Sequence, residues 1–159
     1  MNKSSLKQIL FYSDEGPLAY LTNYYPAKFT LHGKVWPTSE HYFQAQKFPT
    51  RPDFQERIRL EETPDGAKDL AFSTREGFRS DWGEVKNGYM KEGIMEKFLQ
   101  NEDIRMQLLE TGDAQLVEHT TEDSYWGDGG DLGTGTIGQN MLGKILMEVR
   151  DALREKSKL

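Results

Sequence analysis

The amino-acid sequence predicts an α+β protein that is predominantly helical, with a small N-terminal β-hairpin or sheet. The segment "AKFTLHGKVWP" alternates apolar and polar residues on either side of a His-Gly pair, which is typical of a hairpin. After Pro37 the apolar residues recur at helical spacing instead. The 159 residues fit the size of one ordinary domain and contain no repeat or linker, so we expect a single domain spanning residues 1–159.

The individual elements follow from apolar spacing and from the residues that begin and end helices. Pro52 and Pro64 stand near the start of two helical segments, where proline is well tolerated. The last helix carries one continuous apolar stripe. We expect strands at 9–13 and 114–120, a hairpin at 27–37, and helices at 39–48, 52–62, 64–73, 82–100, 101–112 and from Gln139 to about Lys156.

Composition and charge exclude several classes of function. The net charge is −6 and there is no long Lys/Arg run, which argues against a broad nucleic-acid-binding face. An anionic ligand would have to be held locally, and Arg75 and Arg79 in "STREGFRSDW" are candidates, although both could be merely solvated. The absence of cysteine excludes disulfides and thiol nucleophiles. No apolar run is long enough for a membrane span and no secretory signal is evident, so we expect a cytoplasmic protein.

The segment "TEDSYWGDGGDLGTGTIGQN" is the richest in glycine. It contains the letters G-x-G-x-x-G, but neither the preceding strand nor the βαβ unit of a dinucleotide site is present. The glycines before the last helix leave N–H groups that could face a phosphate, or they form a flexible loop. The spacing of Asp123, Asp128 and Asp131 matches neither the ligand positions of an EF-hand nor a His-based zinc motif, so we expect no metal. Trp126 either caps the core or stacks on a flat ligand.

The helix expected at 39–48 has two different faces. One face carries Glu40, Phe43, Gln44 and Lys47, and the other, which we expect in the core, carries His41, Ala45 and Phe48. Glu40 stands in the first turn, where the helix dipole should keep its pKa low, and Lys47 in the last, where the dipole favours a cation. From spacing alone, the two charges either only complement the dipole or belong to a site.

Several motifs together resemble a known family. They are "WPTSEHYFQAQKF", "LVEHTTEDSYWGDGG" and "NMLGKILMEVR", preceded by "FYS" and "LTNYYP", and in this order they resemble the NADAR family, the YbiA-like N-glycosidases, over about residues 11–153. The resemblance implies a single YbiA-like domain that hydrolyses the C–N bond between a ribose and a base. Family members act on ribosylaminopyrimidine phosphates, intermediates of riboflavin biosynthesis, and some remove ADP-ribose from modified guanine in nucleic acid.

The resemblance also assigns roles to residues. Glu40 and Asp123 would be the acidic pair and Trp82 a third functional position, while Lys47 matches a family lysine for which a Schiff-base role is possible. We expect the substrate to contact Asn23, Gln44, Trp126, Gly127, Asp128 and Gly130, with Arg75 or Arg79 on a phosphate. No cofactor, metal or obligate protein partner is expected.

The chemistry agrees with these residue types. Breaking a ribosyl C–N bond generates an oxocarbenium-like cation and a leaving base, so the site needs a carboxylate near C1′ and a proton donor near the base. We expect Glu40, ionised at its helix end, to stabilise the cation or activate water, Asp123 to orient water or manage the proton, and Trp82 and Trp126 to stack on the base. A module that binds ADP-ribose or NAD without turnover, or a purely structural acidic domain, would be the alternatives.

Overall fold

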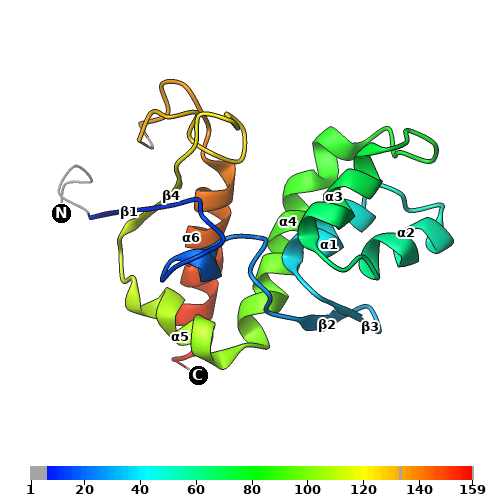
Figure 1. Cartoon of the computed structure of the whole chain (residues 1–159). Coiled ribbons are helices and arrows are strands. Elements are labelled where there is room, and N and C mark those ends of the chain that lie inside the picture. The colour runs from blue at the N-terminus through cyan, green and yellow to red at the C-terminus, as the bar shows by residue number, and fades with distance from the viewer. Residues whose placement is uncertain (1–6, 133, 159) are drawn as a thin grey trace. The chain divides into compact units, whose positions relative to one another are not determined.

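The computed structural model describes residues 7–132 and 134–158. Within these residues the chain is mainly helical, which confirms the predicted α+β class (Figure 1). None of the described helices is long and apolar enough to cross a membrane. The elements are β1 (Gln8–Phe11), the 3-10 helix η2 (Ala19–Leu21), β2 (Phe29–Leu31), β3 (Lys34–Trp36), α1 (Ser39–Ala45), α2 (Pro52–Arg59), α3 (Pro64–Phe72), α4 (Trp82–Leu99), α5 (Glu102–Glu110), β4 (Gln115–Glu118) and α6 (Met141–Lys156).

The chain divides into two compact units. Unit 1 is formed by the described residues up to Thr22 together with those from Glu102 onward, and unit 2 comprises Asn23–Asn101. The boundary at Asn101 falls between two consecutive helices, where the sequence has no Gly- or Pro-rich linker. One domain over residues 1–159 therefore stays a prediction.

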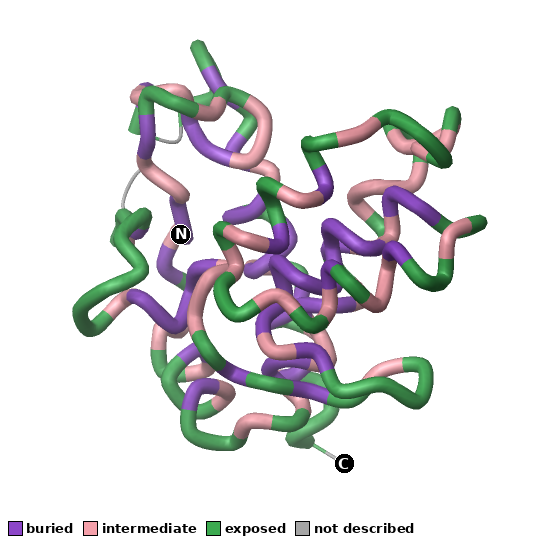
Figure 2. Tube along the Cα trace, turned by 45° about the vertical axis from the view of Figure 1, so that its right-hand side comes forward, coloured by how far each residue is buried: buried purple, intermediate pink, exposed green. Residues whose placement is uncertain are grey.

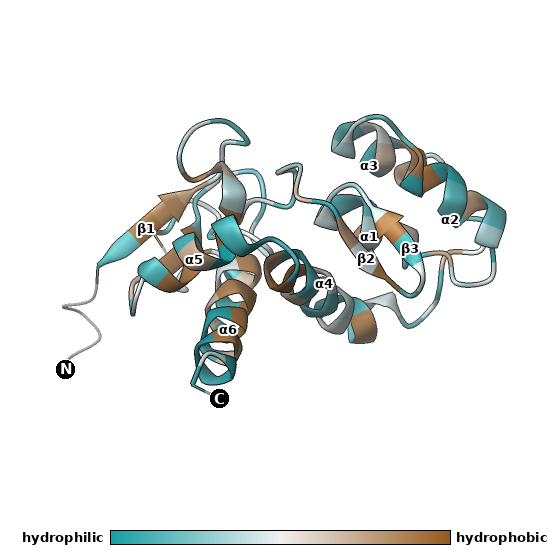
Figure 3. Cartoon of the chain, turned by 90° about the horizontal axis from the view of Figure 1, so that it is seen from below, coloured by the Kyte–Doolittle hydropathy of each residue, from teal (hydrophilic) through white to brown (hydrophobic). Residues whose placement is uncertain are grey.

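Unit 1 is a strand pair covered by helices. β1 runs parallel to β4, with Gln8 opposite Gln115 and Phe11 opposite Glu118. Helix α6 packs along β4, and α5 packs against α6 (Figure 1). Hydrophobic and hydrophilic residues occupy different sides of α6 (Figure 3), and its buried stripe consists of Leu142, Ile145, Leu146, Val149 and Leu153. Because a two-stranded sheet is only marginally stable alone, this helix supplies the burial that holds the strands.

The start of α6 is attached to β4 by its first residues. Asn140 adopts a left-handed conformation with φ of 50°, which Asn tolerates better than most residues, so the helix begins at Met141 rather than at Gln139. The Asn140 amide donates to the Leu116 carbonyl at 3.0 Å and accepts from the Glu118 N–H at 2.9 Å. Gly143 lies so close to β4 that a Cβ atom there would stand 2.0 Å from the Leu116 carbonyl oxygen.

Replacing Gly143 with Ala should therefore destabilise unit 1 by about 3 kcal/mol, because a methyl group forced against backbone must push the helix from the strand. The matched control is Gly88→Ala in α4, where a Cβ would meet no atom within 4 Å. That change should be neutral or stabilise the protein by up to about 1 kcal/mol, because Ala favours the helix. Urea denaturation measures both, and equal stability of the two variants would contradict the close approach.

Unit 2 consists of the β2–β3 hairpin and helices α1 to α4. Phe29 pairs with Trp36 across the hairpin, whose turn is formed by His32 and Gly33 at positive φ, as the sequence predicts. Helix α1 packs against α2, α3 and α4 (Figure 1). The buried positions follow the inner sides of these elements, and the exposed ones gather at the loops (Figure 2). The core consists of Phe29, Trp36, Tyr42, Ala45, Phe48, Phe54, Ile58, Ala67 and Ala71.

Helix α1 is shorter than the sequence suggests. It ends at Ala45 instead of Phe48, and the N–H groups of Lys47 and Phe48 form turn bonds to the Gln44 and Ala45 carbonyls. Pro49 explains the early end, because a proline disfavours helical conformation in the residue before it. Lys47 is therefore not in the last turn of a helix, and its charge does not complement a helix dipole as expected.

Candidate functional site

Helix α1 is fixed by caps and by a buried histidine. The Thr38 hydroxyl accepts from the His41 N–H at 3.2 Å and contacts the His41 ring nitrogen Nδ1 at 2.8 Å. The other ring nitrogen lies 3.0 Å from the Glu61 carbonyl, and burial lowers the pKa of His41. His41, Ala45 and Phe48 are all fully buried, which confirms the predicted core face.

The second face of α1 places a carboxyl group and an amide in direct contact. The Gln44 Nε2 group donates to Glu40 Oε1 at 2.7 Å, and both residues are buried, with 3% and 7% of their surface exposed. The amide oxygen of the same side chain, Gln44 Oε1, is buried and has no hydrogen-bond partner among the described residues. An unsatisfied buried acceptor costs about 1–3 kcal/mol. Such a group is expected where a ligand or water supplies the missing donor.

Burial changes the acid–base properties of Glu40 in the opposite direction from the sequence prediction. Desolvation raises the pKa of Glu40, and the hydrogen bond from Gln44 and the charges of Lys68 and Lys47 offset this only in part. Helix α1 has only seven residues, so its dipole is a small contribution beside full burial. Glu40 is thus better suited to hold a proton than an ordinary glutamate, and the expectation that the helix end keeps its pKa low is wrong.

Lys47 lies among aromatic rings. Its Nζ atom is 4.3 Å from the centre of the Phe72 ring, 5.8 Å from Phe43 and 5.9 Å from Trp82. Only 7% of the residue is exposed, and within the described residues its ammonium group has no hydrogen bond or ion pair. Burial lowers the pKa of Lys47 to about 8, with Glu40 acting in the opposite direction. A lysine with this environment is a candidate nucleophile or proton carrier.

Lys47 should consequently react with an amine-acylating reagent at lower pH than an ordinary lysine. Half-maximal labelling is expected near pH 8, because the neutral amine is the reactive form and the pKa is lowered to about 8. Quantitative mass spectrometry of the labelled peptide measures this, with the exposed Lys144 as internal control. Identical pH dependence for both lysines would show that Lys47 is not desolvated.

Two other residues proposed to contact substrate have their polar groups engaged inside unit 2. The Arg79 guanidinium forms an ion pair with Asp81, at 2.7 Å from Nε to Oδ1, and donates to the Tyr89 hydroxyl at 3.1 Å. The Asn23 Oδ1 atom accepts from the Ser39 hydroxyl at 2.8 Å. These contacts hold α4 and the start of α1 in place, and a ligand contact for either side chain stays a prediction.

Arg75 and Trp82 also lie on this side of unit 2. Arg75 is exposed, and its guanidinium carbon stands 4.0 Å from the centre of the Phe78 ring. Its charge contributes to the lowered pKa of Lys47, and a contact with a phosphate stays a prediction. Trp82 packs against Phe43 at 5.0 Å between ring centres and stacks on Tyr89 at 6.3 Å. Neighbouring aromatic rings therefore cover part of the surface of the Trp82 ring.

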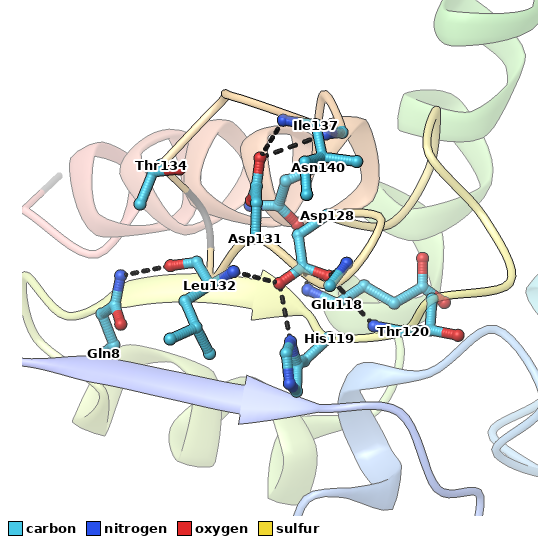
Figure 4. A network of polar contacts seen from close by, with 12 residues as sticks. Gln8, Glu118, His119, Thr120, Asp128, Asp131, Leu132, Thr134, Ile137 and Asn140 are labelled. Carbon is cyan, nitrogen blue, oxygen red and sulfur yellow. Dashed lines mark hydrogen bonds and ion pairs between the residues drawn. The ribbon is translucent and has the colours of Figure 1, made fainter.

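In unit 1, Asp128 organises the glycine-rich loop (Figure 4). Its fully buried carboxylate accepts from the backbone N–H groups of Thr120, Gly130 and Leu132 at 2.8–3.0 Å and contacts His119 Nδ1 at 2.7 Å. Burial alone would raise the pKa of Asp128, but the hydrogen bonds from His119 and the backbone outweigh it and lower the pKa. All of these contacts of the carboxylate are made within the loop, and a place for Asp128 in a ligand pocket stays a prediction.

The other loop aspartates also accept backbone hydrogen bonds. Asp123 Oδ1 accepts from Tyr125 and Trp126 N–H groups, at 2.9 and 2.8 Å, and Asp131 from Ile137 and Gly138. The described residues contain no cluster of three or more His, Cys, Asp or Glu side chains placed to hold a metal. These contacts explain why the sequence concentrates aspartate and glycine here.

Backbone contacts also account for the loop glycines and the first turn of α6. The N–H groups of residues 139–142 donate to the carbonyls of residues 124–127, so they do not face a phosphate. Gly127 is confined, since a Cβ would stand 2.6 Å from the Thr120 methyl group, and Gly130 has φ of 95°. Trp126 is half-buried, with its ring 4.9 Å from that of Tyr125.

The predicted site residues thus divide between the units. Unit 2 brings Glu40, Gln44, Lys47 and Trp82 to one side of α1, whereas Asp123 and the glycine-rich loop belong to unit 1. Sequence reasoning missed two further features of unit 2, the Tyr24 hydroxyl that donates to Asp65 at 2.8 Å and the face of α3 beside Lys47. The spacing of apolar residues in α1 and α3 does not predict that the two helices pack together.

Comparison with known proteins identifies the family. A family model described as the NADAR domain matches residues 10–154. The chain belongs to the NADAR family. It is 41% identical to N-glycosidase YbiA of Escherichia coli K12, over 91% of this chain and 88% of that protein, and 39% identical to an N-glycosidase of Nostoc punctiforme, over 92% of each. The NMR structure of E. coli YbiA matches with a TM-score of 0.84 and 38% identity, covering 95% of this chain and 87% of that one.

A longer relative carries a different name. A riboflavin biosynthesis protein of Vibrio vulnificus is 42% identical over 147 residues, which is 92% of this chain but 39% of that protein. The NADAR region of this chain therefore corresponds to about two fifths of the length of the Vibrio protein. The predicted N-glycosidase family is confirmed, and the residues that carry the activity stay a prediction.

Proposed function

We propose that this NADAR protein is an N-glycosidase that hydrolyses the C–N bond between a phosphorylated ribose and a base, with Glu40 as the proton donor. The observation that carries the proposal is a fully buried carboxyl group of raised pKa, held by Gln44 and followed along the same face by Lys47. The activity is supported by relatives named N-glycosidase at 39–41% identity. These names disfavour a module that only binds ADP-ribose or NAD.

The steps follow from the protonation state of Glu40. Its proton passes to the ribosyl nitrogen of the leaving base, the C–N bond breaks, and both bonding electrons leave with the nitrogen. Glu40 is then a carboxylate that stabilises the cation at C1′. Water adds to C1′ and returns a proton to Glu40, so the products are free base and ribose phosphate. In this scheme Lys47 stabilises the ionised Glu40, and a Schiff base at Lys47 is not required.

Gln44 sets the pKa of Glu40 in this proposal. The Gln44 hydrogen bond lowers the pKa of Glu40, so Gln44→Leu should raise it further. The limb of the pH–rate profile on which activity falls with rising pH should move to higher pH in the variant. Measuring kcat/KM against pH tests this, and a shift to lower pH would contradict the proton-donor role.

The substrate class is proposed from the relatives' names and from the cations near Glu40. The Vibrio relative is named for riboflavin biosynthesis, which favours a ribosylaminopyrimidine phosphate, and ADP-ribosylated guanine, free or in nucleic acid, is the second candidate. A cytoplasmic location fits either substrate.

Chromatography of free base released from both compounds decides between them. Release from one or both is expected. Tight ADP-ribose binding in calorimetry without release of base from either compound would instead favour a non-catalytic module.

A further inference from the structure

The face of α3 beside Lys47 carries an exposed aromatic ring and a free cation. Phe72 has 66% of its surface exposed although its ring lies 4.3 Å from the Lys47 ammonium. Lys68 precedes it by four residues, so both side chains lie on the same side of α3. Within the described residues Lys68 has neither a hydrogen bond nor an ion pair.

Phe72 differs from the other aromatic residues near Lys47. Trp82 packs against Phe43 and Phe78 and stacks on Tyr89, with 15° between the ring planes in the last pair. Phe72 has no such aromatic neighbour among the described residues. It is therefore the ring beside Lys47 that remains open to stack on a flat ligand.

Lys68 lies within electrostatic reach of the residues on α1. Its charge favours ionisation of Glu40 and disfavours protonation of Lys47. Arg75 acts on Lys47 in the same way. In a chain of net charge −6, these cations form no ion pair with a carboxylate among the described residues, a feature that an anionic ligand would explain.

A buried hydrogen-bond acceptor that lacks a donor within the described part of the chain lies on the same side of α1. Gln44 Oε1 belongs to a residue with only 3% of its surface exposed, and no group in residues 7–132 and 134–158 donates to it. A hydroxyl or N–H group of a ligand would satisfy it. Gln44 contacts Glu40, the Phe72 ring contacts Lys47, and the charge of Lys68 acts on both.

We propose that Lys68 and Phe72 on α3 form the second wall of the substrate site, with Phe72 stacked on the base and Lys68 paired with the phosphate of the ribosyl group. This inference rests on the proposed function and extends it to residues outside the family motifs. Side chains four residues apart on a helix lie about 6 Å apart, and a lysine adds its own reach, so one ribose can bridge the two contacts. Base-to-aromatic stacking typically contributes about 1–3 kcal/mol, or about 5- to 150-fold in affinity.

Binding is measured in Glu40→Gln protein, in which turnover is expected to be about 10²- to 10⁴-fold slower. The probes are the compound that the wild type hydrolyses, its dephosphorylated form, and ribose 5-phosphate. Phe72→Ala should weaken binding of both base-containing probes by about 5- to 150-fold and leave ribose 5-phosphate unchanged. Lys68→Gln should weaken both phosphorylated probes about tenfold and leave the dephosphorylated one unchanged.

Two controls separate the wall from general surface effects. Leu60→Ala removes a side chain that is also 66% exposed, and Lys144→Gln removes an exposed lysine of α6, so neither should change any of the three affinities. With Glu40 intact, Phe72→Ala should raise KM and leave kcat nearly unchanged, because stacking acts equally on substrate and transition state.

The outcomes distinguish the two proposals. Suppose that the wild type releases base, but Phe72→Ala and Lys68→Gln bind every probe as their controls do. The assignment of Lys68 and Phe72 to the substrate site is then wrong, and the proposed function stands. If the wild type hydrolyses neither candidate substrate, the proposed function fails and the wall fails with it. Loss of affinity for the base-containing probes in Phe72→Ala and for the phosphorylated probes in Lys68→Gln supports the assignment of both residues to the substrate site.

Discussion

Replacing Glu40 with Gln is expected to reduce kcat for base release by about 10²- to 10⁴-fold, the usual contribution of a positioned acid or base. The amide keeps the shape of the side chain but cannot give a proton to the leaving nitrogen. Glu62→Gln, a change at an exposed position just before α3, should leave kcat unaltered. Steady-state rates at saturating substrate provide the comparison, and full activity of Glu40→Gln would remove Glu40 from the mechanism.

The same variant should fold at least as well as the wild type, which separates catalysis from stability. Because burial raises the pKa of Glu40, its effect on stability is most favourable below the ordinary pKa of a carboxyl group and becomes unfavourable as pH rises through the raised value. A neutral Gln removes that penalty at higher pH. The melting temperature of Glu40→Gln should therefore be unchanged or higher at neutral pH.

Asp128→Ala should cost about 3–5 kcal/mol of stability, the largest effect that we expect from a single side chain of unit 1. The change leaves three backbone N–H groups and His119 without their acceptor, and each unsatisfied buried group costs about 1–3 kcal/mol, partly recovered by water. Urea denaturation measures the loss. Asp113→Ala is the control, since its side chain is 78% exposed and its ion pair with Arg154 should contribute less than about 1 kcal/mol.

The pH dependence of Asp128 gives a second readout. Its pKa is lowered in the folded state, so its contribution is fully present above the ordinary pKa of an aspartate and is lost as pH falls through the lowered value. The difference between wild type and Asp128→Ala should accordingly shrink in acid. A difference that is small at neutral pH would show that the loop does not depend on this carboxylate.

The fold was largely predictable because its elements have strong local signals. The hairpin turn at His32 and Gly33, the prolines that open α2 and α3, and the apolar stripe of α6 all identify their elements. Several element boundaries differ from the prediction, and two of these differences depend on particular residues. Pro49 ends α1 early, and the left-handed Asn140 delays α6. Neither effect is visible in hydrophobic periodicity.

The residues of the candidate site stay a prediction, and the acid–base properties of Glu40 were not predictable from the sequence. The motifs point to Glu40, Gln44 and Lys47; the structure places Glu40 beside Gln44 on α1, and Lys47 lies just beyond the end of this helix. The raised pKa of Glu40 depends on burial by neighbouring elements, which no local pattern reveals. One signal for the second wall was present, since Phe72 is an apolar residue out of phase with the buried Ala67 and Ala71 of α3.

The pH–rate profile of the wild type tests the central claim, that Glu40 gives a proton to the leaving base, most directly. Base release should be measured as kcat/KM from about pH 4 to 9 on the better substrate, with the Gln44→Leu variant alongside. The account predicts that activity falls as pH rises through an ionisation above the ordinary pKa of glutamate, and that this limb moves to higher pH in the variant. An activity that instead rises with pH through that ionisation would mean that Glu40 acts as a carboxylate from the start, and would contradict the account.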